Sequence, residues 1–183
     1  DLLNIIINNF SGIEIDCRLR PEGKSSLLVW DIEDYKKYLV NRARVWELQA
    51  FTKCKFISGN MNLYKQFYSY FLESLKTRDK LTIKNEMLLM NKKIHSSKSN
   101  EINLKLKPGG LTDIDFIVTY FYLTYPELLI ELESDKERNR IYLIKKIASK
   151  IIDMNILQEG FLFLKKTEIV SQNIYNSKTS TIP

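Results

Sequence analysis

The sequence predicts a mainly helical α+β protein in which one small corner carries strands and the rest forms five to seven helices. Two observations lead to this prediction. Residues 13–19 alternate apolar and charged side chains at the two-residue period of a strand. From residue 31 onward, apolar residues recur instead at the three- and four-residue spacing of amphipathic helices. We therefore expect a short strand region followed by a helical bundle.

The strand expected at 13–19 has one apolar face and one charged face. The charged face carries Glu14, Asp16, Arg18 and Arg20. Neighbouring side chains on one face of a strand are about 6.7 Å apart. A carboxylate beside two guanidinium groups suits a site for a metal ion and a polyphosphate, because arginine pairs bidentately with phosphate oxygens. A solvated surface strand whose charges pair with each other is an equally open interpretation.

Residues 31–57 show a helical pattern with a break expected near residues 40–42, and Asp31 is the expected N-cap. A second short strand is expected just before it, at 27–30. Four polar or aromatic residues share one face of the helical pattern: Arg42, Trp46, Gln49 and Lys53. Such a face could line a nucleotide site. The alternative is a half-buried indole flanked by basic side chains whose stems lie along it.

Further helices are indicated by apolar stripes farther along the chain. These stripes are Leu63, Phe67, Phe71 and Leu75; Ile83, Met87 and Met90; Ile141, Ile144, Ile147, Ala148, Ile151 and Ile152; and Leu157, Phe161 and Leu164. Residues 114–123 are apolar almost all round, which predicts the buried central helix of the bundle. Residues 96–103 are expected to form a polar linker, and the tail after Asn173 is expected to fray.

Residues 108–116 predict a Pro-Gly-Gly turn that leads into the central helix. Thr112 is the expected N-cap, with Asp115 as the reciprocal half of a capping box. Asp113 and Asp115 lie about 200° apart on a helix and cannot both face one ligand. We therefore assign Asp113 to the candidate site, as a hydrogen-bond acceptor for a cation such as Arg18 or Arg20. Gly109 and Gly110 are expected to permit close approach between backbone segments.

The composition of the chain argues against several classes of function. The 183 residues include 28 basic and 22 acidic side chains, a formal charge of +6, but they show no long basic run, so we expect no nucleic-acid partner. Apolar runs are too short to cross a bilayer and no export signal opens the chain. Cys17 and Cys54 stand alone, which favours a reduced, cytoplasmic setting. His95 has no second histidine to pair with and is expected at the surface.

Three blocks of this sequence together resemble the glutamine synthetase adenylyltransferases, the bifunctional adenylylating and deadenylylating enzymes. The first block is Asp16-Cys17-Arg18-Leu19-Arg20-Pro21-Glu22-Gly23-Lys24. The second is Trp46-Glu47-Leu48-Gln49-Ala50-Phe51-Thr52-Lys53-Cys54-Lys55, and the third is Pro108-Gly109-Gly110-Leu111-Thr112-Asp113-Ile114-Asp115-Phe116-Ile117. Each block alone is weak, but their order and spacing are fairly specific. The second and third look more like the adenylylating half of the family.

The resemblance implies the C-terminal remnant of a polymerase-beta-like nucleotidyltransferase domain at 1–33, followed by a helical bundle domain at 34–183. In that superfamily three carboxylates hold two magnesium ions. Asp16 matches the third of these, as a catalytic and metal-binding residue. The other two belong to an upstream motif that this sequence lacks, so the fragment alone is expected to be inactive.

The implied reaction is transfer of AMP from ATP to a tyrosine of glutamine synthetase, with possible reversal by phosphorolysis. Arg18, Arg20 and Lys53 would bind the phosphates, while Trp46, Gly109, Gly110 and Asp113 would support the site. The implied protein partners are glutamine synthetase and the PII signal protein. Two departures from the family pattern are Lys53 and Lys55 in place of arginines, and Asp115 in place of a glutamate.

Two other functions remain open from the sequence. One is a related uridylyltransferase that modifies PII, which would prefer UTP. The other is a non-catalytic helical module that docks glutamine synthetase or PII. A thermal shift on addition of magnesium and ATP would distinguish the adenylyltransferase from a docking module.

Overall fold

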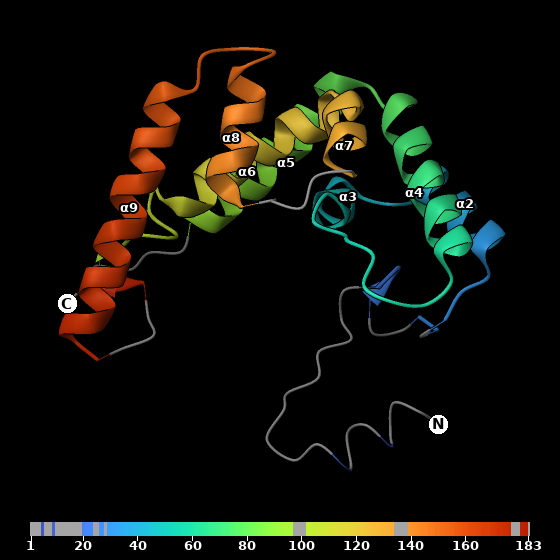
Figure 1. Ribbon diagram of the computed structural model, residues 1–183, viewed down its shortest axis with the longest axis horizontal. Coiled ribbons are helices and arrows are strands. Elements are labelled where there is room, and N and C mark those ends of the chain that lie inside the picture. Colours follow the sequence, from blue (N-terminus) through green and yellow to red (C-terminus); the bar gives the residue numbers. More distant parts are fainter. Residues whose placement is uncertain are drawn as a thin grey trace.

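The structure, a computed structural model, describes residues 5, 9, 20–23, 26–27, 29–96, 102–133, 139–176 and 180–182. This part of the chain is mainly helical, as predicted (Figure 1). Its helices are α2 (Ile32–Asn41), α3 (Val45–Phe51), α4 (Met61–Lys76), α5 (Lys80–His95), α6 (Leu111–Thr124), α7 (Pro126–Glu133), α8 (Arg140–Ala148) and α9 (Asn155–Ile174). The expected strand at 13–19, and with it most of the implied nucleotidyltransferase remnant, lies outside the described residues.

The strands that the structure describes lie where the sequence did not predict them. β1 (Ile102–Asn103) pairs antiparallel with β2 (Thr181–Ile182), and Ile102 lies opposite Ile182. The predictions of a polar linker through residue 103 and of a fraying tail were therefore wrong at these four residues. The strand predicted at 27–30 was also wrong at its described positions, because residues 27, 29 and 30 are not in a strand.

The helical pattern of residues 31–57 folds as two helices with a break near the expected position. Asp31 caps α2 as predicted, since its Oδ1 accepts a hydrogen bond from the Glu33 amide at 2.8 Å. The expected break follows α2, but α3 ends at residue 51 rather than continuing to 57. The predicted single face therefore does not form. Arg42 lies before α3 and pairs with Glu22, whereas Lys53 lies after α3 and reaches toward α6.

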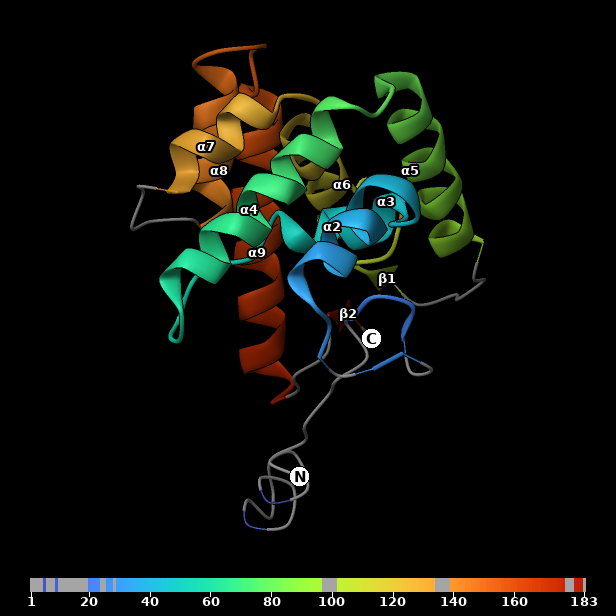
Figure 2. The ribbon, with the colours of Figure 1, turned by 90° about the vertical axis from the view of Figure 1, so that its right-hand side faces the viewer.

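α6 is the central helix, as its apolar sequence predicted. It contacts α3, α4, α5, α7, α8 and α9. In Figure 1, α8 and α9 lie on one side of it and α2 and α4 on the other, and Figure 2 shows α5 and α7 on either side of it. Val118 and Leu123 are fully buried. Because α6 touches most of the other helices, the side chains of its first turns can connect elements that are far apart in the sequence.

The turn before α6 requires a glycine at position 110. A Cβ atom there would lie 2.7 Å from the carbonyl oxygen of Leu104 and 2.8 Å from that of Lys107. The loop carbonyls of Leu104 and Lys105 also accept hydrogen bonds from the first amides of α6, those of Leu111 and Thr112, both at 3.0 Å. The expected close approach of two backbone segments is therefore present at Gly110. As a consequence, backbone carbonyls rather than a side chain accept the hydrogen bonds of the first amides of α6.

Replacing Gly110 by alanine should destabilise the protein by about 1–3 kcal/mol, the usual range for overpacking a site that cannot relax. The atoms in the way belong to backbone, and they cannot move without breaking the hydrogen bonds that start α6. Chemical denaturation followed by circular dichroism measures the change.

Gly160→Ala is the matched control for this substitution. Gly160 lies within α9, and a Cβ added there would meet no atom within 4 Å. Alanine should therefore leave stability unchanged or raise it by up to about 1 kcal/mol through its higher helix propensity. Equal losses in the two variants would contradict the steric role assigned to Gly110.

Candidate functional site

Two carboxylates on the first turns of α6 face opposite sides of the helix. Asp113 contacts residues of α5 and the preceding turn, whereas Asp115 contacts Lys53 and Arg140. This separation agrees with the prediction that the two side chains cannot share a ligand. The two carboxylates thus define two separate polar clusters.

Asp113 holds the turn that precedes α6. The structure places the N-cap at Gly110 rather than Thr112, so the third helical position is Asp113 and not Asp115. Asp113 Oδ2 accepts a hydrogen bond of 2.6 Å from the Gly109 amide. The capping box predicted for Thr112 and Asp115 was therefore wrong, because loop carbonyls accept the hydrogen bonds of the first amides and the helix starts two residues earlier than predicted.

The other oxygen of Asp113 joins α6 to α5. Asp113 Oδ1 accepts hydrogen bonds from Asn91 Nδ2 at 2.6 Å and from His95 Nε2 at 2.8 Å. The His95 side chain is only 16% exposed, so the prediction that it lies at the surface was wrong. Burial raises the pKa of the Asp113 carboxyl, but the hydrogen bonds from Asn91, Gly109 and His95 outweigh it and lower the pKa overall.

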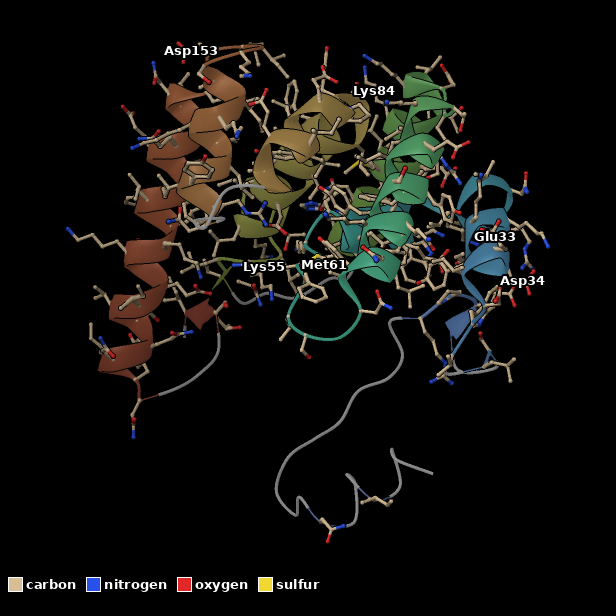
Figure 3. The ribbon with its side chains drawn as sticks, turned by 45° about the vertical axis from the view of Figure 1, so that its right-hand side comes forward. Glu33, Asp34, Lys55, Met61, Lys84 and Asp153 are labelled. Atoms are coloured by element: carbon tan, nitrogen blue, oxygen red, sulfur yellow. The ribbon has the colours of Figure 1, made fainter. Side chains whose placement is uncertain are left out.

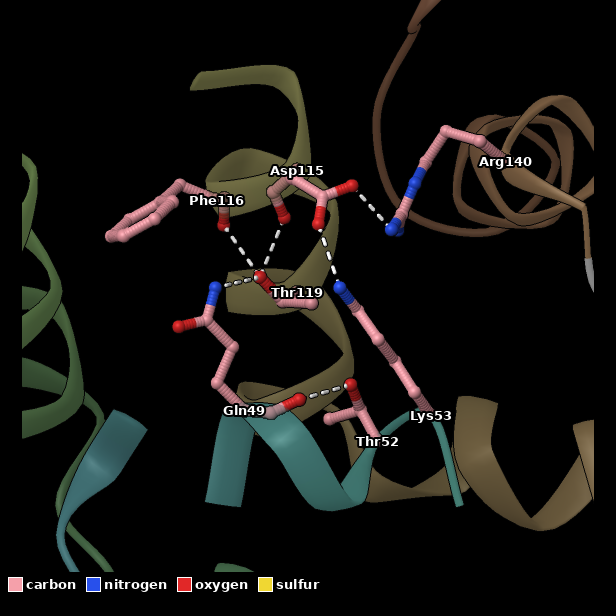
Figure 4. Close-up of polar contacts among 7 residues, drawn as sticks. All are labelled: Gln49, Thr52, Lys53, Asp115, Phe116, Thr119 and Arg140. Atoms are coloured by element: carbon pink, nitrogen blue, oxygen red, sulfur yellow. Dashed lines mark hydrogen bonds and ion pairs between the residues drawn. The ribbon is translucent and has the colours of Figure 1, made fainter. Parts of the chain in front are cut away.

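Asp115 is the centre of the second cluster (Figure 4). Its Oδ2 accepts a hydrogen bond from Lys53 Nζ at 2.8 Å, and its Oδ1 pairs with an Arg140 guanidinium nitrogen. Arg140 is 17% exposed at its side chain, whereas Lys53 is 56% exposed. One carboxylate therefore holds two cations that lie far apart in the sequence.

The second block of the family resemblance contributes mainly structural contacts. Gln49 Nε2 donates to Thr119 Oγ1 at 3.0 Å, and Thr119 is buried in α6 next to the Asp115 cluster (Figure 4). Buried Glu47 accepts the Arg44 amide at 2.8 Å and the Tyr38 hydroxyl. The indole of Trp46 is 39% exposed on α3. These contacts fix α3 against α2 and α6, and so they fix the start of the segment that carries Lys53.

Two hollows lie beside the Asp115 cluster. Lys53 and Arg140 line one of about 260 Å³, together with Thr119. Asp115 and Arg140 line the other, of about 270 Å³, together with Lys105. Because Arg140 lines both, its guanidinium lies at the junction of the two spaces. A phosphate group in the first hollow would meet two cations that Asp115 holds in position, whereas the carboxylates of Asp115 and Glu168 line the second.

Three predicted site residues belong to the strand expected at the start of the chain and the turn after it. Asp16 and Arg18 lie outside the described residues. Arg20 is described, and its Nε donates to the Gly23 carbonyl at 3.0 Å across a turn. Within the described ranges, no group of three or more His, Cys, Asp or Glu side chains could hold a metal ion. No helix in these ranges has the length and apolar character needed to cross a membrane.

Sequence reasoning missed Arg140 altogether. It lies 25 positions after Asp115 in a different helix, and nothing in the spacing links the two. The signals that were available are the capping asparagine before it and its place at the start of an apolar helical stripe. These signals predict a helix, but they do not predict an ion pair.

Comparisons with known proteins agree with the resemblance of the three blocks. Residues 8–70 match the family model described as glutamate-ammonia ligase adenylyltransferase. A bifunctional glutamine synthetase adenylyltransferase/adenylyl-removing enzyme of Aromatoleum aromaticum is 41% identical over 123 residues, or 63% of this chain. Proteins with the same description from Pasteurella multocida and Chromobacterium violaceum are 36% and 35% identical over 65% and 63% of this chain.

The matched part of the chain is therefore similar to the glutamine synthetase adenylyltransferases. Each of these alignments covers 13% of the length of the relative. The relatives are described as having both adenylylating and adenylyl-removing activities.

Asp113→Asn should weaken the dependence of stability on acid pH. The folded pKa of Asp113 lies below the value of about 3.9 for an unfolded aspartate, so its charged form stabilises the fold above that pH. This contribution disappears as pH falls through the folded pKa. The asparagine variant should be less stable at neutral pH and should lose less unfolding free energy between about pH 5 and pH 2.

Urea unfolding at several pH values measures this difference. Asn91→Leu removes one of the donors to Asp113 and should change the acid slope in the same direction but by less. Parallel pH profiles for the wild-type chain and Asp113→Asn would show that Asp113 is not the group responsible.

Proposed function

We propose that this chain is part of a nucleotidyltransferase that transfers AMP from ATP to a tyrosine of glutamine synthetase in the cytoplasm. The observation that carries the proposal is the match of residues 8–70 to the adenylyltransferase family, because this range includes both Asp16 and Lys53. The names of the relatives support glutamine synthetase as the protein substrate. Reversal by phosphorolysis and regulation through PII belong to the same proposal.

In this proposal Asp16 accepts the proton of the attacking tyrosine hydroxyl. Arg18, Arg20 and Lys53 offset the phosphate charge that is redistributed as pyrophosphate leaves. Magnesium would be held by Asp16 together with carboxylates of a longer enzyme, and it would supply further charge stabilisation. One carboxylate supplies too few ligands for two metal ions, and the described residues contain no cluster that could replace the others.

The contacts of Lys53 are compatible with a role at the phosphates. Asp115 fixes the ammonium group at 2.8 Å, and an ammonium group has three donors. A donor held in this way can contact a phosphate oxygen without first being ordered, which reduces the entropy lost on binding. The 56% exposure of the side chain leaves it accessible from solvent.

Asp16→Ala in the full-length enzyme should lower the rate of AMP transfer by about 10²- to 10⁴-fold, the usual contribution of a positioned proton acceptor. Incorporation of labelled AMP into glutamine synthetase measures the rate.

Asp34→Ala is the matched control for Asp16→Ala. Asp34 lies on the outer side of α2 and pairs only with Lys37 among the described residues (Figure 3). We expect this variant to keep the wild-type rate, because an exposed pair of this kind contributes little to stability. Activity of Asp16→Ala within a few-fold of wild type would refute the catalytic role of Asp16.

Magnesium and ATP together should stabilise the full-length enzyme against unfolding more than ATP alone. At 100 times the dissociation constant, a single bound ligand contributes about 2.7 kcal/mol. Thermal unfolding with ATP or UTP, with and without magnesium, separates the three candidate functions. A larger effect of UTP would favour the uridylyltransferase, and the lack of any magnesium-dependent increment would favour a docking module.

A further inference from the structure

A groove of about 590 Å³ lies between the start of α8 and the middle of α9. This volume is within the range of small-molecule binding sites, which is about 300–1,000 Å³. The groove shares Arg140, Phe161 and Lys165 with the 270 Å³ hollow beside Asp115. The two spaces therefore adjoin at Arg140.

The charged side chains that line the groove, among the described residues, are all cations. They are Arg140, Lys145 and Lys165. Asp115 holds Arg140, but a guanidinium group has five N–H donors. Glu168 accepts one hydrogen bond from Lys165 at 2.6 Å, and the ammonium group has two further donors. The groove thus presents donors and positive charge that suit an anion.

The start of α8 adds to this positive potential. Residues 139–142, which are the N-cap and the first turn of α8, all line the groove. The first turn carries no acidic residue. The N-terminus of a helix carries a partial positive charge and favours an anion. Side-chain charge and helix dipole therefore act in the same direction at one end of the groove.

Two aromatic rings, those of Tyr142 and Phe161, also line the groove. An aromatic side chain provides a stacking surface for a nucleobase. We propose that this groove binds a nucleotide, with its phosphates at Arg140, Lys145 and Lys165 and its base against Tyr142 and Phe161. The inference does not depend on the proposed transfer reaction, since it uses none of the residues that the proposed function assigns to catalysis or phosphate binding.

Isothermal titration of the chain with ATP tests the phosphate contacts. An excess of chelator removes any contribution from a metal-dependent site. Lys145→Gln should weaken ATP binding about tenfold, the lower limit expected for loss of a hydrogen bond to a charged group. Lys145→Gln combined with Lys165→Gln should weaken it further, and binding should fall as salt concentration rises.

Lys166→Gln is the matched control, because Lys166 is exposed on α9 next to Lys165 but does not line the groove. It should keep the wild-type affinity. Absence of ATP binding to the wild-type chain at millimolar concentration would overturn the proposal. Equal affinity of the double variant and the Lys166→Gln control would overturn it as well.

Phe161→Leu tests the contact with the base. This variant should weaken binding of ATP and AMP about five- to tenfold and leave binding of inorganic pyrophosphate unchanged, because pyrophosphate has no ring to stack. Circular dichroism checks that the variant keeps its helices. An equal loss for all three ligands would refute the assignment of the base to the Phe161 ring.

Kinetics of the full-length enzyme show whether the nucleotide in the groove is the substrate or an effector. If the groove binds the nucleotide that is transferred, Lys145→Gln should raise the KM for ATP in step with the loss of affinity. If it binds an effector, the KM should stay unchanged while the response of the rate to added AMP is reduced. Unimpaired transfer by Asp16→Ala would refute the proposed function but would leave nucleotide binding in the groove unaffected.

Discussion

The arrangement of the bundle depends on the two carboxylates at the start of α6. Two positions along a helix turn a side chain by about 200°, so Asp113 and Asp115 must serve different neighbours. Asp113 ties α6 to α5 through Asn91, whereas Asp115 ties it to the segment after α3 and to α8. These contacts can form only because α6 starts close to the loop backbone, which Gly110 permits.

Local sequence patterns predicted most of the helices because their causes lie within a few residues. The apolar stripes and the Asp31 cap act over one or two turns, and α2, α4, α5, α6, α8 and α9 formed where those patterns lay. The sheet could not be predicted in this way. Each strand has only two residues, and the partners Ile102 and Ile182 are 80 positions apart. Two residues are too few to show an alternating pattern.

The candidate site shows the same division between local and distant causes. The opposed directions of Asp113 and Asp115 follow from helix geometry and were predictable from their spacing. Their partners were not, because backbone carbonyls accept the first amides of α6 and place its N-cap at Gly110 rather than Thr112, which removes the capping role expected for Asp115. Arg140 was missed for a related reason. A long-range ion pair leaves no trace in the spacing of residues along the chain.

The short sheet has a mechanical consequence. β1 and β2 join residue 102 to residue 182, so the helices α6 to α9 lie within one closed loop of the chain. Buried Glu168 strengthens this closure, since it accepts hydrogen bonds from both Lys165 and Ser180. Residues 102 and 182 lie opposite each other where the chain enters and leaves this loop, so tension applied there would open the paired strands one hydrogen bond at a time. Because only four residues form the clasp, it would open before the helices were pulled apart.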